Sequence, residues 1–169
     1  MINMNILVTG GAGYVGSVLI PSLINAGHKI KCLDRFFFGN EYLSSKEFHG
    51  NLELIKEDIR WFDSKILKDV DLVFDLAALS NDPVGDLNPE KTYEINHLGR
   101  VRVATLSKKM GVPQYILASS ASIYGQQSEI ANETSEVFPI TTYSKANRKA
   151  EIDTLKLDDS TFSVSCMRF

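Results

Sequence analysis

The sequence predicts an α/β fold, a Rossmann doubly wound parallel sheet with strand order 3-2-1-4-5-6. Short apolar runs alternate with helical patterns along the chain, as in parallel strands joined by right-handed crossover helices. A glycine-rich stretch joins the first run to the first helix, and a carboxylate ends the second run. The 169 residues, 44% of them hydrophobic, suffice for one domain with a buried core, which we expect to span 1–169.

The first strand, its turn and the first helix lie near the N-terminus. The apolar run at 5–8 suits a central strand, and apolar residues recur at helical spacing from Val15 to Ile24. Between them, TGGAGYVG at 9–16 lets the backbone turn tightly and approach a pyrophosphate, whose charge is stabilised by N–H groups at the start of the helix. The candidate cofactor-binding residues in this stretch are Gly10, Gly13, Tyr14, Val15 and Gly16.

The second strand, at 29–33, ends at Asp34. A carboxylate at this place can accept both ribose hydroxyls of NAD and repels the 2′-phosphate of NADP, so we expect NAD as the cofactor. Arg35 is a further candidate contact, and its charge would favour that phosphate. The aromatic run at 36–38 either covers the adenosine end of the cofactor or packs against a neighbouring helix.

The remaining strands and helices follow in alternation. Strands are expected at 52–56, 72–76, 115–118 and 162–167. Helices are expected at 62–68, from 88 to 110, and from 139 to about 157, with a turn-rich segment at 80–86. Among the apolar positions of the long helix expected from 88 to 110 are Ile95, Leu98, Val101 and Leu106.

Composition excludes several classes of function. The net charge of −3 has both signs interspersed and gives no basic stripe for nucleic acid, and no apolar run reaches the length of about 18 residues needed to span a membrane. Cys32 and Cys166 fall in apolar runs without metal-ligand spacing, which favours buried thiols in a reducing compartment. We therefore expect a cytoplasmic protein with no metal, membrane or nucleic-acid partner.

Taken together, these motifs resemble the extended short-chain dehydrogenase/reductase family, in its NAD-dependent sugar-nucleotide epimerase and dehydratase branch. The resemblance covers essentially the whole chain. It rests on the glycine turn at 9–16, Asp34, Asp58-Ile59, Leu76-Ala77-Ala78, Asn96, the segment SSASIYG at 119–125, and the stretch from Pro139 to Glu151. It implies cofactor contacts from Asp58 to the adenine, with Ile59 beside it, and a path to the nicotinamide lined by Leu76, Ala77 and Ala78. For Asn96, a hydrogen bond to the backbone is at least as suitable as a ligand contact.

The resemblance also implies catalytic roles. Ser120 would hydrogen-bond the substrate hydroxyl or carbonyl. Family members carry a tyrosine that removes a hydroxyl proton, with a lysine four residues later, one helical turn away, that lowers the pKa of the tyrosine. Tyr143 stands in step with Pro139, but Asn147 occupies the place of the lysine.

Two registers fit this part of the chain. Aligning on Lys145 would put Thr141 in the place of the tyrosine, whereas aligning on Tyr143 keeps both flanking motif residues in step. We favour Tyr143 and take Ser120, Tyr143 and Asn147 as the candidate catalytic residues. A neutral amide in place of an ammonium would make Tyr143 a weaker base near pH 7, unless Lys145 or Lys149 compensates.

The resemblance implies an NAD-dependent nucleotide-sugar epimerase that oxidises a sugar carbon transiently. Dehydratases of the branch place an Asp-Glu pair directly after the residue equivalent to Ser120, where this chain has Ala121-Ser122. The alternatives are an NAD(P)-dependent sugar-nucleotide oxidoreductase or dehydratase, and a catalytically impaired NAD-binding or regulatory module. Family members build most of the substrate pocket from a segment after the sixth strand, which we expect to be absent here. A homodimer is compatible with the resemblance.

Overall fold

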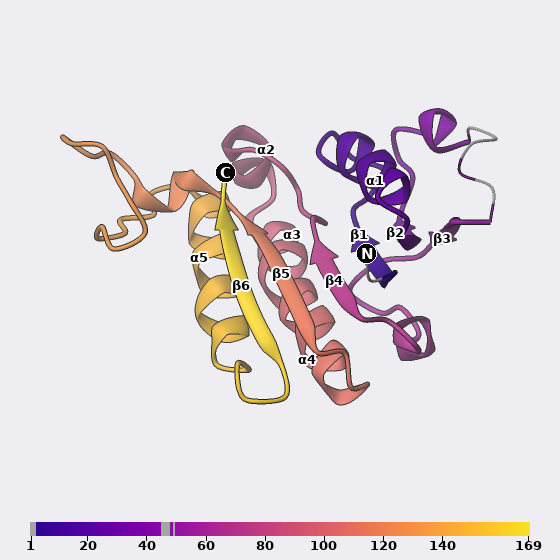
Figure 1. The fold of residues 1–169 in the computed structure, drawn as a ribbon. Helices are drawn as coiled ribbons and strands as arrows, with labels where there is room; N and C mark the ends of the chain where they lie inside the picture. Colours follow the sequence, from indigo (N-terminus) through magenta and orange to yellow (C-terminus); the bar gives the residue numbers. More distant parts are fainter. Residues whose placement is uncertain (1–2, 45–47, 49) are drawn as a thin grey trace.

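A single parallel sheet organises the computed structural model, which describes residues 3–44, 48 and 50–169. Its strand order is β3-β2-β1-β4-β5-β6, and every neighbouring pair is parallel (Figure 1). The predicted fold class and strand order are therefore confirmed. The strands are β1 Asn5–Thr9, β2 Lys29–Asp34, β3 Leu52–Lys56, β4 Leu72–Asp75, β5 Gln114–Ser119 and β6 Ser163–Arg168.

Both faces of the sheet bury side chains, as the alternation along β1 shows. Leu7 points into a core cluster shared with α4 (Arg100–Lys109) and α5 (Thr142–Leu155). Ile6 points into a second cluster on the opposite face, shared with α1 (Gly16–Asn25). Figure 1 shows α3, α4 and α5 together on one side of strands β4 to β6. The central strand is thus buried on both faces, as a parallel sheet requires.

The shorter elements depart from the sequence expectations in two places. The segment expected as a turn contains a helix, α2 (Asp82–Leu87), because the Asn81 side chain accepts the Val84 N–H at 3.0 Å and a proline lies in the first turn. The helix expected at 62–68 is only a 3₁₀ turn. The remaining short elements are η1 Glu41–Leu43, η3 Ser64–Leu67, α3 Pro89–Tyr93, η4 Glu94–Gly99 and η5 Ala121–Tyr124.

The long helix predicted after Asn88 is present as α3, η4 and α4 in succession, and η4 is a π-helical segment. Of its apolar residues, Leu98 is 59% exposed, whereas Ile95, Val101 and Leu106 are half-buried, and Ile95 and Leu106 pack against the core cluster that contains Leu7. The residues that this helix buries are Thr92, Asn96, Gly99, Arg100, Val103, Ala104 and Ser107.

Close backbone packing explains two glycines of the first turn. A Cβ on Gly16 would lie 2.1 Å from the Gly11 carbonyl oxygen, so α1 can approach β1 only without a side chain there. Gly10 has φ +64° and would place a Cβ 2.6 Å from the Ala77 backbone. A Cβ on Gly13 would meet only the Gly10 oxygen, at 3.2 Å, within the part of the chain that the structure describes. Gly13 therefore has more room than the other two.

This difference predicts that Gly16→Ala lowers the free energy of unfolding by about 1–3 kcal/mol, because the new methyl group collides with backbone atoms. Gly13→Ala is the matched control, and we expect it to cost clearly less. Urea unfolding followed by circular dichroism measures both variants. Equal stability of the two would contradict the packing role of Gly16.

Candidate active site

The expected site residues converge on one cleft with a volume of about 1370 Å³ at the carboxyl ends of the strands. Ligands bind at this edge in open parallel sheets, where the strand order reverses between β1 and β4. Gly16, Asn96 and Asn147 are the expected residues that do not line it. Those that line it are Gly10, Gly13, Tyr14, Val15, Asp34, Arg35, Asp58, Ile59, Leu76, Ala77, Ala78, Ser120 and Tyr143.

The glycine turn presents backbone rather than side chains to the cleft. Its hydrogen bonds run from Gly13 N–H to the Gly10 oxygen at 3.0 Å and from Ser17 N–H to the Gly13 oxygen at 3.0 Å. No side chain in the described part of the chain caps α1, whose N-cap is Val15. The Tyr14, Val15 and Gly16 N–H groups have no hydrogen-bond partner among the described residues, so they remain available to an anion, which fits the phosphates of a dinucleotide.

Asp34 is fixed at the end of β2 by two backbone groups. Its Oδ2 accepts the Ala12 N–H at 3.0 Å, and its Oδ1 accepts the Phe36 N–H at 2.8 Å. An ionised carboxylate has about four acceptor positions, so each oxygen keeps capacity for a hydroxyl. The residue expected to bind a ribose is thus oriented and still able to accept.

Asp58, by contrast, is saturated by two arginines. Arg35 NH1 lies 2.7 Å from its Oδ2 and Arg60 NH2 lies 2.8 Å from the same oxygen, while Arg60 donates its backbone N–H and Nε to Oδ1, both at 3.0 Å. Burial alone would raise the pKa of Asp58, but the hydrogen bonds from Arg60 and Arg35 outweigh it and lower the pKa to about 2. The Asp58 carboxylate has no acceptor position left for an adenine. The Arg35 guanidinium binds Asp58 and not Asp34, the residue expected to bind the ribose.

The aromatic run after β2 divides between the two alternatives. Phe37 and Phe38 are 75% and 90% exposed and line the cleft, as a covering loop would. Phe36 instead packs against the core cluster that contains α1.

Asn96 has a structural role in this fold. It is fully buried, its Oδ1 accepts the Leu79 N–H at 2.8 Å, and its Nδ2 donates to the Leu79 oxygen at 2.9 Å. These two bonds fasten the loop after β4 to the π-helical segment, which keeps Ala77 and Ala78 on the cleft wall.

Ser120 and Tyr143 reach the cleft from neighbouring elements. Ser120 follows β5, and its Oγ accepts the Ser122 N–H at 3.2 Å. Tyr143 lies in the first turn of α5, which is capped by Thr141. The Thr141 hydroxyl donates to Asp82 and does not line the cleft. Of the two registers, the geometry favours the one that starts from Tyr143.

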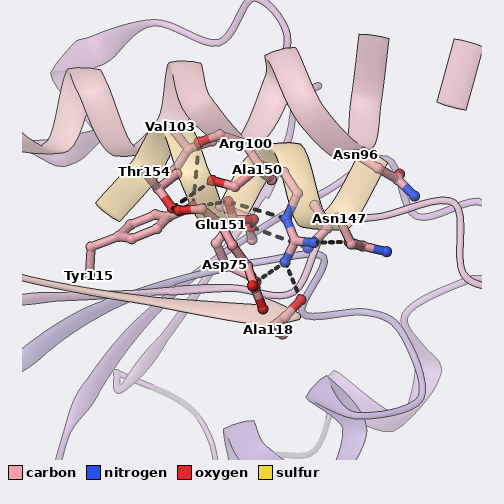
Figure 2. A network of polar contacts seen from close by, with 12 residues as sticks. Asp75, Asn96, Arg100, Val103, Tyr115, Ala118, Asn147, Ala150, Glu151 and Thr154 are labelled. Atoms are coloured by element: carbon pink, nitrogen blue, oxygen red, sulfur yellow. Dashed lines mark hydrogen bonds and ion pairs between the residues drawn. The ribbon is translucent and has the colours of Figure 1, made fainter. Parts of the chain in front are cut away.

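Asn147 points away from the cleft into a buried polar network (Figure 2). It is 1% exposed, and its Oδ1 accepts a hydrogen bond from Arg100 NH1 at 2.8 Å. Lys145 and Lys149 are exposed, and the Lys149 ammonium lies 5.0 Å from the centre of the Tyr93 ring, so neither takes the place of the missing lysine. Sequence reasoning missed Arg100, whose only signal was its place in step with Asn96 along the helix.

The described residues form neither a metal site nor a membrane-spanning helix. Within residues 3–44, 48 and 50–169, no group of three His, Cys, Asp or Glu side chains could hold a metal ion. No helix in the same ranges has both the length and the apolar character needed to cross a membrane. Cys32 and Cys166 are free thiols, the first buried and the second half-buried.

Comparison with known proteins agrees with this geometry. The sequence pattern of the NAD dependent epimerase/dehydratase family matches residues 6–169. The chain belongs to this family. UDP-glucuronic acid decarboxylase 1 of Xenopus tropicalis is 33% identical over 153 residues, which are 86% of this chain and 35% of that protein. UDP-glucuronic acid decarboxylase 4 of Arabidopsis thaliana is 32% identical over 162 residues, which are 92% of this chain and 35% of that protein.

Solved structures of the family superpose well. A UDP-N-acetylglucosamine 4-epimerase from Methanobrevibacter ruminantium M1, in complex with UDP-N-acetylmuramic acid, has a TM-score of 0.92 and 30% identity, covering 99% of this chain and 55% of that one. A UDP-glucuronic acid 4-epimerase from Bacillus cereus, in complex with UDP-glucuronic acid and NAD, has a TM-score of 0.88 and 25% identity, covering 98% and 56%. The chain therefore spans about a third of its curated relatives and about half of these structures.

The saturated carboxylate predicts a pH dependence of stability. Because the pKa of Asp58 falls from 3.8 to about 2 on folding, its charged form stabilises the protein above about pH 5, by about 2 kcal/mol. That stability is lost as the pH falls toward 2. We expect the stability difference between the natural protein and Asp58→Asn to shrink over this range in urea titrations. Val103→Ala, which removes buried volume and no ionisable group, is the control, and its stability difference should not change with pH.

Proposed function

We propose that this chain is the cofactor-binding part of an NAD-dependent nucleotide-sugar epimerase. The observation that carries the proposal is the shared cleft, which is lined by the start of α1 without a side-chain cap, the oriented carboxylate of Asp34, Ser120 and Tyr143. The relatives named above support it, since two are UDP-sugar epimerases and one of these holds NAD. A further stretch of protein would supply the sugar pocket, as it does in longer family members.

The cofactor residues divide the work along the cleft. The glycine turn would hold the pyrophosphate, Asp34 the adenosine ribose, and the small side chains of Ala77 and Ala78 would admit the nicotinamide. Adenine recognition is left to Ile59 and the neighbouring backbone, because the Asp58 oxygens are occupied. When bound, NAD supplies the acceptor that takes a hydride from the sugar carbon and returns it.

The catalytic residues act on the sugar hydroxyl. Tyr143 would take the hydroxyl proton during oxidation and return it during reduction, and the Ser120 hydroxyl would hold the same oxygen. Elimination of water needs a further acid and base. Ala121 and Ser122 supply neither, the Asp82 carboxylate accepts from Thr141, and Glu94 pairs with Arg60 at 2.8 Å. These engagements favour epimerisation over dehydration.

Decarboxylation is a second candidate, because the curated relatives at 32–33% identity are UDP-glucuronic acid decarboxylases. Oxidation of a sugar hydroxyl, in which the same tyrosine would take the proton and NAD the hydride, could precede either outcome. The two candidates differ in their products, since only decarboxylation releases carbon dioxide. UDP-glucuronic acid, named in the relatives of both kinds, is therefore the first substrate to assay.

Cofactor selectivity follows from the positions of Asp34 and Arg35. We expect NAD to bind about tenfold or more tightly than NADP, since the carboxylate repels a 2′-phosphate and Arg35 is held by Asp58 at 2.7 Å. Calorimetric titration of the chain with both cofactors measures the ratio, and Asp34→Asn should narrow it. Tighter binding of NADP would mean that Arg35 dominates.

The reaction itself is tested in deuterated water. The protein, with any sequence that its gene encodes after Phe169, is incubated with UDP-glucuronic acid and UDP-N-acetylglucosamine. We expect inversion at one sugar carbon without net change in NADH absorbance, and Tyr143→Phe should lower turnover by about 10²–10⁴-fold. Accumulation of a 4-keto-6-deoxy sugar carrying deuterium at C6 would show a dehydratase, and release of carbon dioxide would show a decarboxylase.

A further inference from the structure

A buried guanidinium lies directly behind the wall of the cleft. Arg100, on the inner face of α4, is 1% exposed. Its NH1 donates to Asn147 Oδ1 at 2.8 Å, and its NH2 donates to the carbonyl oxygens of Asp75, at 2.8 Å, and Ala118. Its Nε lies 3.7 Å from Asp75 Oδ2. Figure 2 shows the side chain reaching toward all three partners.

Each partner stands next to a segment of the cleft wall. Asp75 ends β4, just before Leu76 and the two alanines. Ala118 precedes Ser119 and Ser120 at the end of β5. Asn147 lies one helical turn after Tyr143 and donates from Nδ2 to the Tyr143 carbonyl oxygen at 3.1 Å. The Arg100 side chain therefore connects β4, which leads to the two alanines, β5, which leads to Ser120, and α5, which carries Tyr143.

We propose that Arg100 is a positioning residue of the active site, which acts through Asn147 to hold Tyr143 in place relative to Ser120. On this proposal the positive charge near Tyr143 is that of Arg100 on α4, in place of a lysine at position 147 on α5. Residue 147 is an amide because Arg100 needs a hydrogen-bond acceptor there. The inference rests on the proposed function only for the roles given to Ser120 and Tyr143.

The charges around the guanidinium explain why a lysine does not fit at 147. The charged side chain that faces Arg100 in the described network is the Asp75 carboxylate, which also accepts from the Thr9 and Tyr115 hydroxyls. A lysine at 147 would place a second buried cation beside Arg100, and the buried Glu151 carboxylate one turn further along α5 is already paired with Arg148 and Arg168. One of the two charges would then lack compensation, which is strongly unfavourable in the interior.

A charge exchange tests the proposal on the chain alone. We expect Asn147→Lys to lower the thermal unfolding midpoint by roughly 6–20 °C. In the double variant Arg100→Met/Asn147→Lys, the single cation now comes from α5 and can reach the same carbonyl groups, so most of that loss should be recovered. Arg102→Met is the matched control, because Arg102 lies on the same helix as Arg100 but is directed to the Phe62 ring, 5.7 Å away. Combined with Asn147→Lys, it should not restore stability.

A second measurement separates positioning from general stability. In protein labelled with ¹³C at tyrosine Cζ, the Tyr143 signal, assigned from Tyr143→Phe, should shift in Arg100→Met and stay in place in Val103→Ala, which removes buried volume from the same helix. The charge argument would be overturned if Asn147→Lys left the unfolding midpoint unchanged, if Arg102→Met restored the stability of Asn147→Lys, or if Arg100→Met/Asn147→Lys did not regain stability. An unmoved Tyr143 signal in Arg100→Met would overturn the positioning role. Neither measurement needs turnover, so both stand apart from any failure to detect epimerisation.

Discussion

A buried carboxylate at the end of β4 is the interaction on which the arrangement of the cleft depends. Asp75 is fully buried, accepts hydrogen bonds from the Thr9 and Tyr115 hydroxyls at 2.5 Å, and faces the Arg100 guanidinium. Burial and the adjacent carboxylate raise the pKa of Tyr115 well above its ordinary value, so this phenol remains a donor. The two terminal nitrogens of Arg100 are satisfied by Asn147 and by two carbonyl oxygens, while its Nε has, among the residues described, only the charge of Asp75 at 3.7 Å. These contacts connect β1, β4, β5 and α4 around one buried carboxylate.

The fold could be predicted from the sequence because its signals are local. Alternating apolar runs, the glycines at 10–16 and the helix caps each depend on a few adjacent residues. The buried face of the long helix could not be predicted from the sequence, because the apolar pattern assumes α-helical spacing and Glu94–Gly99 is π-helical. Arg100 was missed for a related reason: its partners Asp75 and Asn147 lie 25 and 47 residues away in the sequence.

The candidate site shows the same division between local and distant information. The sequence correctly placed Asp34, Ser120 and Tyr143 around one cleft, because each follows a strand or begins a helix at the expected edge. What it could not show is which polar atoms are already occupied. Asp58 receives four hydrogen bonds from two arginines, which leaves its oxygens no free acceptor position. Asn96 makes two hydrogen bonds with the Leu79 backbone, the structural alternative that the sequence analysis had left open.

The two backbone hydrogen bonds to Asp34 have a consequence for the lifetime of a complex. They join the glycine turn to the loop after β2 through Ala12 and Phe36, so this corner of the cleft is ordered by the protein itself. A protein segment that is already ordered loses little conformational entropy when a ligand binds, and such sites gain affinity mainly through slow release. An enzyme that regenerates its cofactor within each cycle would then exchange it rarely, and its response to a changing cellular redox ratio would lag behind its catalytic rate.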